Sequence, residues 1–136
     1  MTLLELTQKY YELENYNCAE TLIHAANEYY HLSLHEEDMK MMAGFGGGMY
    51  TGMTCGALTG CVAALSKMII STKAHESQDI RRAVQSCIRH FKQNLQGTQC
   101  VEIKPIHHKP DTKCLPTCLL AAKALEQTIQ EFQMND

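Results

Sequence analysis

Apolar side chains recur every three or four positions along most of the chain, which is the spacing of helices that bury one face. The pattern is clearest between Glu76 and Gly97, where charged and amide side chains fill the remaining positions. It predicts an amphipathic helix that Gly97 ends, because glycine readily takes the left-handed conformation common just after helices. The core face is expected to hold Ile80, Val84, Cys87, Ile88, Phe91 and Leu95.

Capping residues locate the first two helices. A short helix is expected over residues 2–13. Further on, Asn17 is a favourable N-cap, and Glu20 lies three residues later, as a capping box requires. The second helix is therefore expected to start with Cys18 as its first helical residue.

A third helix is expected to open at Ser33 or His35 and to end at Gly44, where a glycine-rich stretch begins. Seven of the chain's eight glycines lie between Gly44 and Cys61. The stretch lacks the third glycine of the dinucleotide fingerprint and the Gly-Lys-Ser/Thr ending of a P-loop. A tight turn with positive φ is expected instead, bringing backbone N–H groups near a ligand or a sulfur. This turn comprises Gly46, Gly47 and Gly48.

The fourth helix is expected to run from Thr54, its N-cap, to about Ile70. That assignment makes Cys55 the first helical residue. Gly56 and Gly60 lie four residues apart and share one face of the helix, where they allow another backbone to approach closely. A compensating contact is expected, because an interior helical glycine costs about 1 kcal/mol relative to alanine.

The C-terminal third is expected to contain one connection and one helix. Two prolines limit residues 98–114 to a connection with a single turn at 98–103. The last helix starts near Pro116. No segment shows strand alternation, an internal repeat or a linker, so the sequence predicts an all-α fold: a single domain over residues 1–136, built as a bundle of about five or six helices with a glycine-rich loop. The core face of the last helix is expected to hold Cys118, Ala121, Ala122, Leu125, Ile129 and Phe132.

Composition narrows the possible functions. The net charge of −3 provides no basic field for nucleic acid, so no nucleic-acid partner is expected. The longest apolar stretch, residues 57–70, contains Lys67 and is too short to span a bilayer. No signal peptide is visible, so no membrane insertion and a cytoplasmic location are expected. In that compartment, seven cysteines do not predict a disulfide framework.

Four of the cysteines lie where helices or turns are expected to begin. Amide N–H groups and the helix dipole stabilise a thiolate at such positions, so lowered thiol pKa values are expected. Lysine and histidine side chains between the third and fourth of these cysteines would act in the same direction. The other three, Cys61, Cys87 and Cys118, lie on apolar helix faces and are expected to be buried core residues. The four candidates for chemistry are Cys18, Cys55, Cys100 and Cys114.

Five short stretches together resemble the C-GCAxxG-C-C family, which is named for its cysteines and is associated with redox activity without a known substrate. They are YNCAET, GFGGGM, TCGALTG, GTQC and KCLPTCLLAAKALE, and they span residues 16–126. The resemblance places the family's four cysteines on the same four candidates. For the fourth cysteine, Cys114 is preferred to Cys118 because it keeps the family's spacing to the downstream AAKALE stretch. The choice between these two cysteines stays open. The CGAxxG motif falls on Cys55, Gly56, Ala57 and Gly60.

Two redox chemistries and one non-catalytic role remain open. In thiol–disulfide exchange, a thiolate attacks a disulfide and a second cysteine resolves it, with Cys55 as the candidate nucleophile. Alternatively, the four thiolates hold a metal or an iron–sulfur cluster in an electron carrier, although their separations of 37, 45 and 14 residues match no ribbon or ferredoxin motif. A helical interaction protein would need none of the cysteines.

The expected cofactor and partner depend on which of these chemistries the protein uses. Thiol exchange requires no cofactor, whereas the alternative requires an iron–sulfur cluster or zinc. The partner is expected to be a redox protein or a small thiol or sulfur compound, and a homo-oligomer is left open. A bound cofactor is expected to face the backbone of Gly46, Gly47, Gly48, Gly56 and Gly60.

Overall fold

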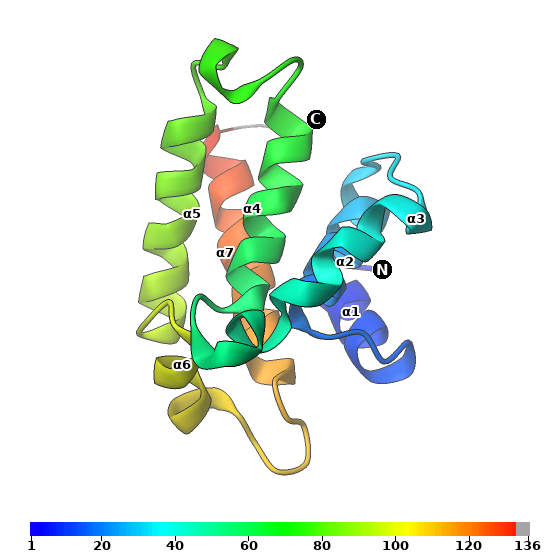
Figure 1. The fold of residues 1–136 in the computed structure, drawn as a ribbon, viewed down its shortest axis with the longest axis vertical. Coiled ribbons are helices and arrows are strands. Elements are labelled where there is room, and N and C mark those ends of the chain that lie inside the picture. Colours follow the sequence, from blue (N-terminus) through cyan, green and yellow to red (C-terminus); the bar gives the residue numbers. More distant parts are fainter. Residues whose placement is uncertain (133–136) are drawn as a thin grey trace.

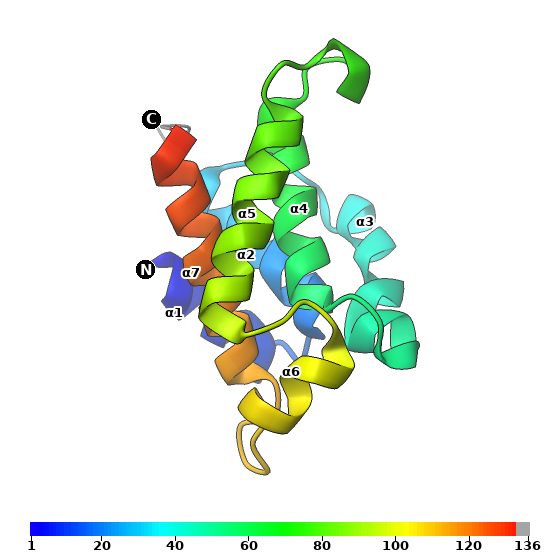
Figure 2. The same ribbon diagram turned by 90° about the vertical axis from the view of Figure 1, so that its left-hand side faces the viewer.

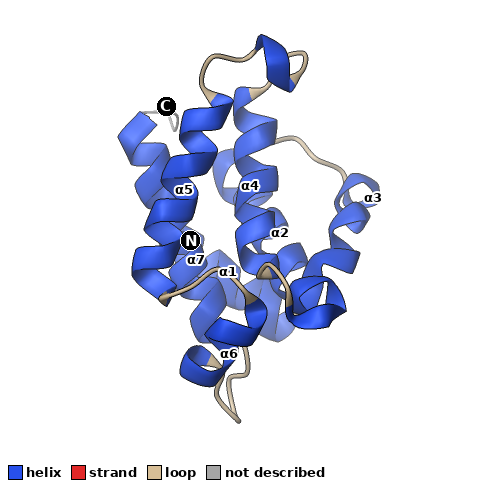
Figure 3. Cartoon of the chain, turned by 60° about the vertical axis from the view of Figure 1, so that its left-hand side comes forward, coloured by secondary structure: helices blue, strands red, loops and turns tan. Residues whose placement is uncertain are grey.

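The computed structural model describes residues 1–132 and is all-α, which confirms the predicted fold class. It holds seven α-helices where about five or six were predicted. Within the described residues there is no strand (Figure 3). Two isolated bridges join Thr54 to Gln99 and Lys109 to Lys113. The α-helices are α1 (Leu3–Gln8), α2 (Cys18–Tyr30), α3 (Glu36–Met39), α4 (Gly56–Ile69), α5 (Ile80–Leu95), α6 (Cys100–His107) and α7 (Leu115–Phe132).

Three long helices form one half of the bundle. α4 and α5 run antiparallel, and α7 packs against both (Figure 1). The second half of the bundle contains α2 and α1. α2 packs against α4 and also contacts α7, and α1 packs against α2 and α7. The N-terminal ends of α4 and α7 and the short helix α6 lie at the same end of the bundle (Figures 1 and 2). None of the helices within residues 1–132 is both long and apolar enough to cross a bilayer.

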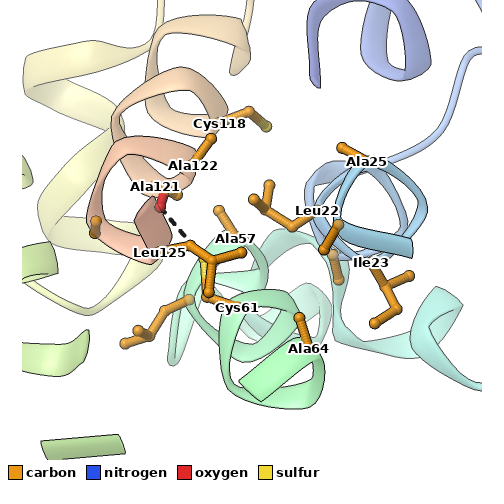
Figure 4. Packing of buried hydrophobic residues seen from close by; sticks show 14 of the residues in the cluster. Leu22, Ile23, Ala25, Ala57, Cys61, Ala64, Cys118, Ala121, Ala122 and Leu125 are labelled. Carbon is orange, nitrogen blue, oxygen red and sulfur yellow. Dashed lines mark hydrogen bonds between the residues drawn. The ribbon is translucent and has the colours of Figure 1, made fainter. Parts of the chain in front are cut away.

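Small side chains let α2, α4 and α7 approach closely at the centre. Ala57, Cys61 and Ala121 are fully buried there, beside Leu22 and Leu125 (Figure 4). The Cys61 thiol donates a hydrogen bond of 3.4 Å to the Ala121 carbonyl, which links α4 to α7. This close packing matters for the site because it fixes the starts of the three helices relative to one another.

Two expectations about helix ends were wrong. Cys55 is the N-cap of α4 and Gly56 is its first residue, because Thr54 instead bridges to Gln99. α5 ends with Gln96, not Gly97, in the left-handed conformation (φ 62°), which shows that glycine is not essential at that position.

The segment after Gly97 is more helical than expected. α6 has eight residues and continues through Pro105. This is possible because Pro105 lies in the last turn, where a missing N–H removes only one hydrogen bond at an exposed helix end.

The two predicted core faces were partly wrong. On α5, Ile80, Val84 and Ile88 are only half-buried, and the buried positions include Ala83 and Ser86. The core face is therefore rotated toward α7, with which α5 packs extensively. On α7, Phe132 is half-buried and its ring lies under the Arg82 guanidinium at 5.3 Å. The remaining residues expected on the two faces are buried.

Replacing Gly60 by alanine is expected to lower the free energy of unfolding by about 1–3 kcal/mol. A Cβ atom there would lie 2.8 Å from the Leu22 Cβ and 2.9 Å from the Ala19 carbonyl oxygen, so α2 would have to move away from α4. Chemical denaturation measures the effect. Gly44→Ala is the matched control, since a Cβ there meets nothing within 4 Å. Equal stability of the two variants would contradict the close α2–α4 contact.

Candidate thiol site

All four candidate cysteines, which lie at or next to the starts of α2, α4, α6 and α7, line one cavity of about 540 Å³. Three of them are buried, with Cys18 and Cys100 each 8% exposed and Cys55 4%, while Cys114 is half-buried. Four segments far apart in the sequence therefore meet at one hollow. The other side chains around it are Tyr11, Glu12, Asn15, Tyr16, Asn17, Ile103, Lys104, Asp111, Thr112, Lys113 and Thr117.

Cys18 is placed by the N-cap that the sequence predicted. The Asn17 side chain accepts from the Glu20 N–H at 3.0 Å, and the Glu20 carboxylate accepts from the Asn17 N–H at 3.0 Å. Asn17 also donates to the Ala43 carbonyl at 2.9 Å, which joins this cap to the start of the glycine-rich loop. The thiol of Cys18 therefore lies among the free N–H groups of the first turn of α2.

The glycine-rich loop makes a turn of left-handed conformation. Gly47, Gly48, Met49 and Tyr50 all have φ between 58° and 62°. For the two non-glycine residues this conformation costs about 1–2 kcal/mol each. The turn directs the Gly47 N–H at the Cys18 sulfur. Strained backbone of this kind concentrates at functional sites, where the surrounding structure maintains it.

The expectation of positive φ at Gly46 was wrong. Gly46 has φ −63°, so positive φ begins only at Gly47. Gly46 is required for space instead, because a Cβ there would lie 2.4 Å from the Asn17 amide nitrogen. Gly47 is the one member of the five predicted glycines among the residues lining the cavity. At Gly56, a Cβ would lie 2.7 Å from the Cys18 sulfur, so this glycine lets the sulfur rest against the start of α4.

Backbone hydrogen bonds bring Cys55 and Cys100 together. The N–H of Cys55 donates to the Thr98 carbonyl at 2.8 Å, and the N–H of Cys100 donates to the Met53 carbonyl at 2.6 Å. Two short extended segments thus pair side by side, and each leads directly into a helix. This pairing aligns the starts of α4 and α6, so their cysteines reach the same cavity.

Cys114 is held by the N-terminal segment of the chain. Its N–H donates to the Tyr11 hydroxyl oxygen at 3.0 Å, and its carbonyl accepts from the Cys118 N–H in the first turn of α7. Tyr11 lies in a π-helical turn, Lys9–Leu13, that follows α1, and π turns often occur at functional sites. Burial raises the Tyr11 pKa to about 12, so its hydroxyl keeps its proton and can donate it toward a sulfur.

We expect Tyr11→Phe to raise the pKa of Cys114 further and to lower the free energy of unfolding by about 1–2 kcal/mol. The tyrosine hydroxyl lowers the pKa of that thiol, and it satisfies the Cys114 N–H. Site-resolved alkylation between pH 8 and 10, with denaturant unfolding, measures both effects. Tyr29→Phe serves as the control, because this exposed α2 residue is outside the cavity wall. Identical Cys114 reactivity in both variants would remove Tyr11 from the site.

Cys18 and Cys55 have opposite electrostatics although both lie at helix starts. Interaction with the Cys55 thiol lowers the pKa of Cys18 to about 6, with further help from the backbone N–H groups of Gly47 and Ala19. The same interaction, together with burial, raises the pKa of Cys55. Near neutral pH, one member of the pair is therefore a thiolate and the other is a protonated hydrogen-bond donor.

The prediction that all four thiols have lowered pKa values was wrong for three of them. Burial raises the pKa of Cys100 and of Cys114, and it outweighs the positive charge of Lys104, which acts in the opposite direction. The expected effect of the lysine is present but smaller than desolvation. These thiols stay protonated at pH values where Cys18 is ionised.

The three remaining cysteines are buried core residues, as predicted. Cys61, Cys87 and Cys118 are all 0% exposed. Cys61 and Cys87 interact with each other between α4 and α5, which raises the pKa of Cys61 and lowers that of Cys87. Cys118 lies one turn after Cys114 and is not among the residues that line the cavity. The geometry thus favours Cys114 for the fourth position of the set.

Residues 1–132 contain no group of three or more histidine, cysteine, aspartate or glutamate side chains placed to hold a metal ion. The four thiols surround a cavity of about 540 Å³.

Four cysteines at or next to helix starts line one cavity, and the pKa of one of them is lowered, which is a feature of reactive cysteines. The chain belongs to the C-GCAxxG-C-C family, described as "Putative redox-active protein", whose sequence profile matches residues 16–128. No curated protein and no solved structure matches the chain significantly.

Part of the cavity wall lies outside the family match and was not predicted. Tyr11, Glu12 and Asn15 line the cavity but precede residue 16, where the match begins. The local sequence offers no signal for them, because their position depends on the packing of α1 against α7. These three residues are therefore part of the cavity wall that the family match does not cover.

Proposed function

We propose that the protein is a thiol–disulfide oxidoreductase in which Cys18 is the attacking thiolate and Cys55 is the resolving thiol. The observation that carries this proposal is the Cys18–Cys55 pair at the cavity, with the pKa of Cys18 lowered to about 6 by its neighbour. The lowered pKa favours the thiolate form of Cys18 near neutral pH. This favours Cys18 over Cys55, the nucleophile predicted from the sequence.

The reaction balances as two successive exchanges. The Cys18 thiolate attacks a disulfide RSSR, which forms a Cys18–SR mixed disulfide and releases RS⁻. The proton of Cys55 passes to that leaving thiolate. The new Cys55 thiolate then attacks the Cys18 sulfur, forms a Cys18–Cys55 disulfide and releases a second RS⁻. The substrate disulfide gains two electrons, and the protein dithiol loses two.

A dithiol reductant must return the oxidised protein to its starting state. We place this cycle in the cytoplasm, where thiol pools supply such a reductant. In this proposal Gly47 supplies an N–H group to the Cys18 sulfur, and Gly56 lets that sulfur lie close to the start of α4. Cys100 and Cys114 line the same cavity as this pair.

A single-turnover experiment on anaerobically purified protein tests the proposal. The reduced chain is mixed with 2-hydroxyethyl disulfide, released thiol is counted, and the protein disulfide is located by peptide mass spectrometry. We expect two thiols released and a Cys18–Cys55 disulfide, in protein without stoichiometric metal. A Cys18–Cys100 or Cys18–Cys114 disulfide would overturn the role of Cys55. Stoichiometric iron and acid-labile sulfide, lost in Cys55→Ser, would replace the proposal with an electron carrier.

A further inference from the structure

The cavity has the dimensions of a small-molecule site. Its volume of about 540 Å³ falls within the roughly 300–1,000 Å³ usual for small ligands. Three of its four cysteines are at most 8% exposed, so a substrate disulfide must enter the cavity to reach Cys18. A disulfide carried on a folded protein surface would have to project far from its own chain to do so.

The cavity wall carries two positive and two negative side chains. Lys104 comes from α6 and Lys113 from the turn before α7, whereas Glu12 comes from the π turn after α1 and Asp111 from the 109–113 turn. Within residues 1–132 none of the four takes part in an ion pair. All four residues are exposed where they border the cavity, so both signs of charge are available there to a ligand.

The lysine on α6 acts on two of the cavity thiols. Lys104 acts on both Cys100 and Cys114, lowering the pKa of each against the larger effect of burial. In the turn before α7, the Asp111 carboxylate accepts a hydrogen bond from the Thr112 N–H at 2.9 Å. A ligand with one sign of charge would leave two of the four wall charges without a counter-charge.

We propose that the substrate is a small zwitterionic disulfide, each half of which carries a carboxylate and an ammonium group, as in the disulfide of an amino-acid thiol. This inference rests on the proposed function. Lys104 and Lys113 bind the carboxylates, and Glu12 and Asp111 bind the ammonium groups. The bound disulfide then presents its S–S bond to Cys18, and the two exchanges described above reduce it to two amino-acid thiols.

A charge series of small disulfides tests the inference. The probes are cystine (zwitterion), cystamine (dication), 3,3′-dithiodipropionate (dianion) and 2-hydroxyethyl disulfide (neutral). Each rate constant for the reduced protein is divided by that of dithiothreitol with the same disulfide, which removes differences in intrinsic reactivity. We expect the normalised rate for cystine to exceed that for the neutral probe about tenfold, with the two singly signed probes between them.

Charge-removing variants locate the contacts. Lys104→Gln is expected to lower the rates with cystine and dithiodipropionate about tenfold and to leave cystamine within about twofold. Asp111→Asn, which keeps a hydrogen-bond acceptor, is expected to lower the rates with cystine and cystamine and to leave the rate with dithiodipropionate unchanged. Lys67→Gln, at the opposite end of α4, is the control and should change none of the rates.

The outcomes separate the two proposals. Normalised rates that are equal across the series, or highest for a singly charged probe, would overturn the inference and leave the oxidoreductase intact. Faster reduction of insulin disulfides than of cystine would likewise overturn it. No reduction of any probe by fully reduced protein would overturn the proposed function, and the inference with it.

Discussion

Cys18→Ser is expected to lower the rate of disulfide reduction at least about 100-fold, because it removes the cavity thiol whose pKa is lowered to about 6. Serine preserves the size and the hydrogen bonds of the side chain, so the fold should be unaffected. The measurement is 2-hydroxyethyl disulfide reduction at pH 7 with dithiothreitol as the recycling reductant. Cys118→Ala is the control, since Cys118 is fully buried outside the cavity wall.

The pH profile gives this prediction a second measurable feature. Since the pKa of Cys18 is lowered to about 6, its alkylation by iodoacetamide should rise with pH, reach half its maximum near pH 6 and level off above pH 7.5. An ordinary cysteine reaches half-maximum near pH 8.5. Peptide mass spectrometry follows Cys18 separately from the other thiols. A midpoint near pH 8.5 at Cys18 would show that the Cys55 thiol and the amides do not stabilise the thiolate.

Cys55 can be tested for both of its proposed roles with two substitutions. In Cys55→Ser the hydroxyl still donates a hydrogen bond, so Cys18 should stay reactive at pH 6.5 but accumulate as an unresolved mixed disulfide. In Cys55→Ala the donor is lost, so the pKa of Cys18 should rise and its alkylation at pH 6.5 should fall several-fold. The same reactivity in both variants would mean that the neighbouring donor is not what lowers the pKa.

The helical fold was predictable because its signals are local. The capping box at Asn17 and Glu20 set the start of α2 correctly, and the positions of buried residues on α7 followed from helical spacing. The failures occur where a distant segment decides the local structure. Thr54 is not the N-cap of α4 because Gln99, 45 residues away, pairs with it, and no local pattern encodes that pairing.

The four cysteines of the cavity were predictable, whereas their electrostatics and the rest of the cavity wall were not. Cysteine at four helix starts, together with the family resemblance, identified the four cysteines that line the cavity. The relative pKa values depend on which sulfurs touch and how deeply each is buried, and both arise only from tertiary packing. Cys18 and Cys55 occupy similar local positions, yet their contact shifts one pKa down and the other up. Tyr11 reaches Cys114 across 103 residues, which sequence spacing does not reveal.

Gly56→Ala is expected to raise the pKa of Cys18 toward its ordinary range and to lower alkylation at pH 6.5 about tenfold or more. A Cβ at residue 56 would lie 2.7 Å from the Cys18 sulfur and 2.6 Å from the Phe45 carbonyl oxygen. The carbonyl belongs to the backbone and cannot rotate away, so the sulfur or the whole loop must move. Either movement separates the Cys18 thiolate from the N–H groups of the loop.

Loss of stability alone could also change reactivity, and Gly60→Ala controls for it. That substitution lies one turn later on the same face of α4 and forces a similar separation from α2, but it meets Ala19 and Leu22 instead of the sulfur. Both variants are expected to lose about 1–3 kcal/mol of stability, so a loss of Cys18 reactivity confined to Gly56→Ala would assign the effect to the sulfur contact. Equal losses would mean that helix spacing controls the thiolate, and normal reactivity in both would mean that the sulfur does not rest against Gly56. If the loss of reactivity is confined to Gly56→Ala, the CGAxxG spacing reflects two separate requirements: Gly60 for helix packing and Gly56 for a thiol of lowered pKa at the cavity.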